Sequence, residues 1–117
     1  MANPKSDHER VALLQGTLDL LILRTLVFGS NHGQGIARAI QYQAEDTLLV
    51  DHGSLYPALQ RLESRGWITG EWGVSDNNRK ARFYTLTKIG RKHLVSEAKQ
   101  WWRLAAAVGR ILGAEEE

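Results

Sequence analysis

Cysteine is absent from the 117 residues, and so are long uninterrupted apolar segments. A chain without cysteine forms neither a disulfide framework nor a thiolate metal site, which fits a reducing compartment. No apolar run approaches the length of a membrane span, and no basic segment followed by an apolar stretch marks a secretion signal near the N-terminus. We therefore expect a cytoplasmic protein that does not enter a membrane.

The residue clusters that bind metals or perform catalysis are lacking as well. None of the four histidines pairs with another at metal-ligand spacing, and no carboxylate cluster accompanies them. Asp51, His52 and Ser54 are close in sequence, but a catalytic triad assembles across a fold and needs an oxyanion site. No phosphate-binding glycine loop is present. We expect no enzyme, no metal and no cofactor.

Charge is distributed unevenly, although the net charge is only +2. Residues 52–92 carry eight cations against three anions, whereas residues 1–51 carry four against six and residues 93–117 carry three against four. A basic middle between mildly acidic ends points to a surface in the middle third that binds a polyanion. Chance clustering in a chain of this size is the plainer alternative.

Residues 51–66 are predicted to form a helix with one apolar face. Leu55, Leu59 and Leu62 recur at helical spacing and form a stripe that would be buried. The opposite face has a flat start, then hydrogen-bonding side chains, then cations, which suits the major groove of DNA. A solvated outer face of a core helix is the alternative. The residues of this face are His52, Gly53, Ser54, Tyr56, Gln60, Arg61 and Arg65.

Both ends of this helix carry sequence signals. Gly66 can adopt the left-handed conformation that ends a helix. At the start, either Asp51 or Ser54 can cap the free backbone N–H groups. Pro57 favours Ser54, because proline fits best in the first helical turn. If Asp51 is the cap, Pro57 lies deeper and should bend the first turns, so both alternatives stay open.

Two helices are expected before this one. Residues 10–28 are apolar nearly all round, which predicts a helix central to the core or shared with a partner, with Thr17 capping its main segment. After a glycine-rich turn, residues 34–43 form a short amphipathic helix, and residues 44–50 connect it to the helix over 51–66. The last two helices make a helix-turn-helix unit with a long turn.

A β-hairpin is expected directly after that unit. Residues 67–72 and 82–86 alternate apolar and polar side chains and are rich in aromatic and β-branched types. The segment between them, residues 73–80, is a polar turn cluster. A hairpin in this place is a wing, and its amides and cations suit phosphate contact or entry into the minor groove. Those side chains are Asn77, Asn78, Arg79, Lys80 and Arg82.

A long helix is predicted to close the chain, from the cap Thr87 to about Leu112. Its apolar residues step by four and three as in a coiled coil. Such a helix is about 37 Å long, which exceeds what a small domain can cover, so part of it should pack on another subunit. The seam consists of Leu94, Ala98, Trp101, Ala105, Val108 and Leu112, widened by Trp102 and Ile111.

We therefore expect a mainly α-helical protein with a small β-hairpin. Residues 10–86 form a winged helix-turn-helix DNA-binding domain, and residues 87–113 form a C-terminal dimerisation helix. A flexible N-terminal arm (residues 1–9) and an acidic tail (residues 114–117) flank them. A winged-helix module that binds only protein is the competing function, and steeply salt-dependent DNA binding distinguishes the two.

Several of these motifs together closely resemble the PadR family of bacterial transcriptional regulators. The resemblance covers roughly residues 10–100, and the single short C-terminal helix resembles the small-subunit branch of the family. Its most specific part is Leu55-Tyr56-Pro57-Ala58-Leu59, followed later by Tyr84, Leu86, Thr87 and Gly90. The other matching stretches are residues 16–18, 20–21, 32–35, 53–63, 66–68 and 78–87.

The resemblance implies a homodimeric regulator, usually a repressor, that binds a palindromic operator in double-stranded DNA. Some relatives bind planar aromatic effectors in a cavity between subunits that is lined by tryptophans, and Trp101 matches that position. For Trp101 and Trp102 we favour dimer packing over an effector site. The expected DNA-binding residues are Gly53, Ser54, Tyr56, Pro57, Gln60, Arg61, Asn78, Arg79, Lys80 and Arg82. The expected effector or dimer-interface residues are Leu14, Leu18, Leu94, Ala98, Trp101, Trp102, Ala105 and Val108.

Overall fold

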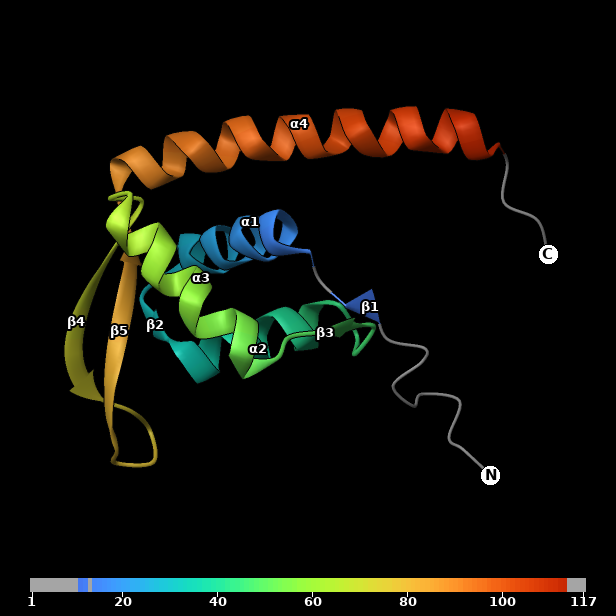
Figure 1. Cartoon of the computed structure of the whole chain (residues 1–117). Coiled ribbons are helices and arrows are strands. Elements are labelled where there is room, and N and C mark those ends of the chain that lie inside the picture. The colour runs from blue at the N-terminus through green and yellow to red at the C-terminus, as the bar shows by residue number, and fades with distance from the viewer. Residues whose placement is uncertain (1–10, 13, 114–117) are drawn as a thin grey trace, which may run out of the picture.

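The computed structural model describes residues 11–12 and 14–113, so the predicted arm (residues 1–9) and tail (residues 114–117) lie outside the described residues. The chain is mainly helical, with two small sheets (Figure 1). In chain order the elements are β1 (Val11–Ala12), α1 (Gln15–Thr25), the 3-10 helix η2 (Leu26–Phe28), β2 (Asn31–His32), α2 (Gly33–Gln43), β3 (Leu48–Leu49), α3 (His52–Ser64), β4 (Ile68–Val74), β5 (Lys80–Leu86) and α4 (Lys88–Leu112).

The first helix is shorter than its apolar run predicts. Val11–Ala12 pairs in parallel with Leu48–Leu49, so α1 starts only at Gln15. The prediction that Thr17 caps this helix is wrong, because the backbone N–H of Leu18 already donates to the carbonyl of Leu14 at 2.9 Å. Leu14 therefore occupies the cap position, and its side chain makes no capping hydrogen bond.

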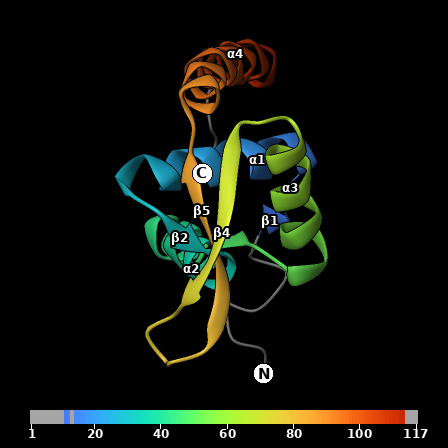
Figure 2. The same cartoon turned by 90° about the vertical axis from the view of Figure 1, so that its left-hand side faces the viewer.

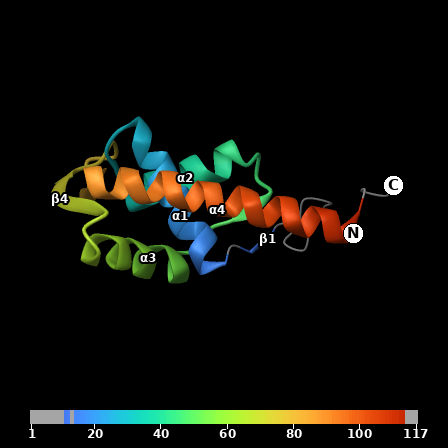
Figure 3. The ribbon, with the colours of Figure 1, turned by 90° about the horizontal axis from the view of Figure 1, so that it is seen from above.

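The core forms around α1, which contacts α2, α3 and α4. Seen from above, α4 crosses over α1 (Figure 3). Ile22 of α1, Ile36 of α2, and Leu55 and Leu62 of α3 have no exposed surface, and Leu59 of α3 is almost as deeply buried. The predicted leucine stripe of α3 is thus confirmed, and each such side chain stabilises the fold by about 1.5–3 kcal/mol through burial.

The predicted hairpin is present and is part of a three-stranded sheet in the order β2-β5-β4. Strands β4 and β5 are antiparallel, with Ile68 opposite Leu86 and Val74 opposite Lys80, so they extend further toward the tip than predicted. Asn31–His32, expected in a turn, pairs with β5 instead. The wing, defined here as residues 68–86, points away from α4 (Figures 1 and 2).

Helix α4 begins where the wing ends, and Thr87 caps it as predicted. The Thr87 hydroxyl oxygen accepts from the N–H of Gly90 at 2.9 Å, and the hydroxyl donates to the carbonyl of Gly66 at 2.7 Å. The Thr87 N–H donates to the carbonyl of Trp67 at 3.1 Å. Nearby, the rings of Trp67 and His93 stack with their centres 4.0 Å apart. These contacts join the start of α4 to the end of α3.

The second half of α4 extends past α1 (Figure 1) and leaves large apolar side chains in solvent. Trp101 is 38% exposed, Trp102 68% and Ile111 84%. In the part of the chain that the structure describes, no helix is long and apolar enough to cross a membrane. These exposed apolar side chains lie on α4, a helix that also carries many charged residues.

Gly90 provides a test of the contact between α4 and the segment that joins α3 to β4. A Cβ atom there would collide with the backbone carbonyl of Trp67, which cannot move aside as a side chain could. Gly90→Ala should therefore lower the free energy of unfolding by about 1–3 kcal/mol, as measured by urea denaturation. Gly109→Ala, in the same helix with no atom near the added methyl, is the control and should raise stability by up to about 1 kcal/mol. Equal effects of the two changes would contradict this packing.

Candidate nucleic-acid interface

The start of α3 is capped by Asp51. Its Oδ1 accepts from the backbone N–H of Ser54 at 2.8 Å, and Asp51 has the extended backbone of a capping residue. This settles the choice between Asp51 and Ser54, and it places Pro57 inside the helix rather than in the first turn. His52 and Gly53 follow the cap directly, so the free N–H groups and the positive end of the helix dipole lie at the exposed start of α3.

The end of α3 is fixed by the glycine that the sequence indicated. Gly66 has φ +77°, its N–H donates to the carbonyl of Glu63 at 3.0 Å, and the N–H of Trp67 donates to that of Leu62 at 3.0 Å. These two hydrogen bonds form a Schellman motif. Because both ends of α3 are fixed, the outer face of the helix has a defined position on the body.

The outer face of α3 is exposed over its first two turns. The exposed residues that were predicted to contact DNA are Gly53, Ser54, Tyr56, Pro57 and Gln60. The start of α3 and the tip of the wing both lie on the side of the molecule away from α4 (Figures 1 and 2). The structure therefore brings the two predicted DNA-binding segments to one side.

Tyr56 packs on the start of α2 while part of it remains exposed. Its side chain is 45% exposed, and its ring lies so close to Gly33 that a Cβ there would meet the ring at 2.8 Å. The ring also meets His52 edge-on, with centres 5.8 Å apart. The start of α2 thus supports the tyrosine ring, while the hydroxyl lines the cleft beside the wing.

The wing tip is an ordered turn with exposed cations. The backbone N–H of Ser75 donates to the carbonyl of Arg79 at 2.8 Å, and the Ser75 hydroxyl donates to the Asn77 side-chain oxygen at 2.5 Å. Asn78 takes the left-handed conformation with φ +63°. Lys80 lies over the ring of Trp72, 5.3 Å from its centre. Asn78, Arg79 and Lys80 are all exposed, as a phosphate contact requires.

Arg61 is held by an ion pair that the sequence did not reveal. Its Nη2 donates to Oδ1 of Asp19 in α1 at 2.7 Å, and its side chain is only 28% exposed. Glu63, two residues further along α3, pairs with Arg82 rather than with Arg61. A phosphate contact by Arg61 has no support in this arrangement, because the guanidinium already has an anionic partner inside the fold.

Arg82 is held in the same way, by Glu63 of α3. Its Nη2 donates to Oε2 of Glu63 at 2.5 Å, and this hydrogen bond raises the pKa of Arg82. The guanidinium lies against Gly70 on the neighbouring strand, where any larger residue would displace it. Beside it, burial raises the pKa of the Tyr84 hydroxyl, which stays neutral. Arg82 therefore joins the wing to α3 and has less freedom to reach a phosphate than Arg79 or Lys80.

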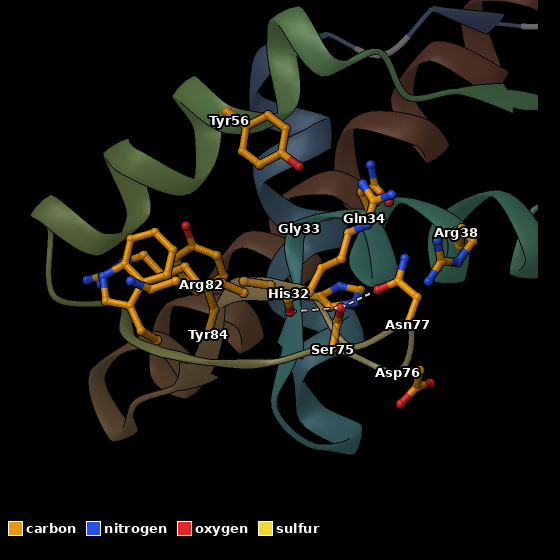
Figure 4. A pocket seen from close by; sticks show the side chains of 14 residues that line it. His32, Gly33, Gln34, Arg38, Tyr56, Ser75, Asp76, Asn77, Arg82 and Tyr84 are labelled. Atoms are coloured by element: carbon orange, nitrogen blue, oxygen red, sulfur yellow. Dashed lines mark hydrogen bonds between the residues drawn. The ribbon is translucent and has the colours of Figure 1, made fainter.

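A cleft of about 500 Å³ lies between the start of α2, Tyr56 and the wing. Figure 4 shows Gly33 and Gln34 from α2, Tyr56 from α3, and Ser75 and Asn77 from the wing arranged around it. Asp76 is the acidic residue among those that line this cleft. The cleft thus connects the outer face of α3 with the wing tip.

The predicted effector or dimer-interface residues fall into two groups. Leu18 and Leu94 are 1% and 8% exposed within a single chain, so they pack in the core around α1 and offer almost no surface to a partner. The remaining residues are at least partly exposed and stay available for a partner. They are Leu14, Ala98, Trp101, Trp102, Ala105 and Val108.

Comparison with known proteins identifies the family. The model of the PadR-like family of transcriptional regulators matches residues 22–96, from α1 through the wing into α4. The chain belongs to this family. A PadR family transcription regulator from Clostridium difficile is 26% identical, with a TM-score of 0.67 over 82% of this chain and 98% of that one.

Two further proteins are similar to this chain. A transcriptional regulator from Clostridium thermocellum shares the fold of this PadR-like chain, with a TM-score of 0.77 at 23% identity over 85% of this chain and 96% of that one. A curated protein from Lysinibacillus sphaericus is 27% identical over 92 residues, which are 79% of this chain and 84% of that protein. The PadR-like chain is therefore a transcriptional regulator with a winged helix-turn-helix fold.

The cap of α3 can be tested by substitution. Asp51→Ala should lower the free energy of unfolding by about 0.5–2 kcal/mol, because the Ser54 N–H loses its acceptor. Asp51→Asn should retain most of the stability, and Ser54→Ala should change it by less than about 0.5 kcal/mol. Urea denaturation without DNA measures all three. A larger loss for Ser54→Ala than for Asp51→Ala would contradict the assignment.

Proposed function

We propose that this PadR-like regulator binds palindromic double-stranded DNA as a homodimer and represses transcription by occupying its operator. The observation that carries the proposal is the common orientation of the start of α3 and the wing tip on the side opposite α4 (Figures 1 and 2). The start of α3 would enter the major groove, where Ser54 and Gln60 offer hydrogen bonds to base edges. Selection of bound duplexes from a random pool tests this proposal and yields the operator.

The wing supplies the contacts that do not depend on sequence. Arg79 and Lys80 are exposed, and Asn78 lies beside them in the turn. Such cations neutralise backbone phosphates and release counterions, which makes binding weaken as salt rises. A module that binds only protein would lack this dependence on salt.

The proposed dimer is formed through α4. Trp101, Trp102 and Val108 remain exposed in one chain, on a helix of about 37 Å that extends beyond α1. A second copy of the chain would cover this apolar face and pair two copies of α3. Their half-sites would lie about 34 Å apart, one turn of the duplex.

A planar aromatic effector is the proposed means of releasing the operator. Trp101 and Trp102 meet edge to face, with ring centres 5.0 Å apart, at the surface where the subunits would join. Aromatic rings favour offset-stacked or edge-to-face contact with another ring, so a flat ligand could be held there. Competition between candidate aromatic compounds and the selected duplex tests this part of the proposal.

The first prediction of this proposal concerns the wing. Arg79→Ala combined with Lys80→Ala should weaken binding to all duplexes by a similar factor and lower the salt slope by about 0.9 for each phosphate that is no longer neutralised. Binding titrations from about 50 to 200 mM salt measure both effects. Lys99→Ala with Arg103→Ala, on exposed positions of α4, removes the same charge and is the control. Unchanged affinity of the wing variant would refute the role of the wing.

The second prediction concerns α4. Trp101→Glu should raise the dissociation constant of the dimer by about a hundredfold or more, because an unpaired buried charge costs about 3–5 kcal/mol. Sedimentation equilibrium measures the change. Gln100→Glu adds the same charge on an exposed neighbouring position off the apolar seam, and it should leave the dimer intact. A Trp101→Glu variant that stays as dimeric as this control would rule out the interface.

A further inference from the structure

Arg38 lies on α2, outside both segments that carry the proposed DNA contacts, yet its side chain lines the cleft between α3 and the wing. We propose that this cleft binds a backbone phosphate of duplex DNA and that Arg38 is the ligand contributed by α2. The inference rests on the proposed DNA-binding function. It adds a third element of the fold to the surface in contact with the duplex.

Both sides of the cleft present groups that bind phosphate. Gln34 and Arg38 are four residues apart on α2, so they lie on the same face of that helix, and both are exposed. The opposite side carries Arg79 and Lys80 of the wing. In Figure 4 the Arg38 side chain lies near Asn77 at the wing tip, across the opening of the cleft. A phosphate between α2 and the wing would therefore meet cations from two directions.

In the described part of the chain none of these cations forms an ion pair, although Lys80 contacts the ring of Trp72. Among residues 11–12 and 14–113, ion pairs join only Arg61 to Asp19 and Arg82 to Glu63. Arg38, Arg79 and Lys80 are exposed and have no anionic partner among these residues. Three like charges around one opening repel each other, and a polyanion relieves that repulsion.

The acidic residues near Arg38 are few and do not neutralise it. Asp76 lines the same cleft from the wing, and Glu45 and Asp46 share a neighbouring hollow with Arg38 beyond the end of α2. None of the three forms an ion pair with it in the described part of the chain. Asp76 should repel the phosphate. Removing the charge of Asp76 should therefore strengthen DNA binding, whereas removing the charge of Arg38 should weaken it.

A DNA backbone suits this cleft because of its position. The cleft continues from Tyr56 on α3 to the wing tip, so a duplex that receives the start of α3 in its major groove would bring a flanking strand across the opening. In helix-turn-helix proteins the first helix of the unit crosses the backbone, and α2 occupies that place here. A strand of phosphates, rather than a base edge, is therefore the chemistry that Arg38 would meet.

The test uses the full chain and two duplexes, one selected from a random pool and one of unrelated sequence. Arg38→Ala should weaken binding of both duplexes by a similar factor, about tenfold near 0.15 M salt, and lower the salt slope by about 0.9 for each chain bound. Arg38→Lys should restore most of the slope. Asp76→Asn should tighten binding of both duplexes.

Arg103→Ala is the matched control, since it removes one exposed cation from α4 on the side away from the wing. It should leave the affinity and the slope near the values of the unmodified protein. If Arg38→Ala binds as well as this control while the unmodified protein binds DNA, the inference about the cleft is wrong and the proposed function stands. If the unmodified protein binds no duplex at low salt, both proposals are wrong.

Discussion

Thr87 connects four pieces of backbone that come together at one place in the fold. Its hydroxyl oxygen accepts from Gly90 at the start of α4, and the hydroxyl donates to Gly66 at the end of α3, while its own N–H donates to Trp67 just before β4. Thr87 itself follows the last residue of β5. One residue thus links the end of α3, the start of β4, the end of β5 and the start of α4. Gly90 completes the junction, because only a residue without a side chain allows α4 to approach so closely.

Two ion pairs determine which cations of the basic middle segment remain available for a ligand. Asp19 binds Arg61 on the side of α3 that faces α1, and Glu63 binds Arg82, which lies opposite Trp72 in the wing. Pairs of this kind, partly shielded from solvent, orient elements more than they stabilise them. The pair between Glu63 and Arg82 joins the wing to α3. It therefore helps to set the separation between the exposed cations at the wing tip and the start of α3. The cations of the basic middle segment therefore include two that are held in ion pairs within the fold and others that remain exposed.

The sequence predicts the elements whose signals are local. The start of α4 at Thr87, the end of α3 at Gly66 and the hairpin between them all follow from patterns within a few residues. The partners of Arg61 and Arg82 could not be predicted in this way, because they lie 42 and 19 residues away along the chain. Asp19 offered one signal, since it is the one acidic residue in the otherwise apolar run of residues 18–23.

Several other differences between the predicted and the observed structure also arise from contacts between segments that are distant in the sequence. The two-residue strands β1 and β2 exist only through pairing with distant segments, so no periodicity within them could reveal a strand. Leu18 could not be separated from Leu14 by hydrophobicity, although one is buried in the core and the other is 78% exposed. For the cap of α3 two local rules competed. The side-chain preference for Asp51 prevailed over the positional preference of Pro57, as the hydrogen bond to Ser54 shows.

The attachment of α4 at one end has a mechanical consequence. The helix is held at Thr87, at Gly90 and at its contacts with α1, and its second half extends past α1 as a stiff rod (Figure 1). A tilt of only about five degrees at that pivot would displace the far end of a rod of this length by roughly 3 Å. In a pair of subunits joined through such rods, a small change in how the rods cross becomes a much larger change in the separation of the two copies of α3.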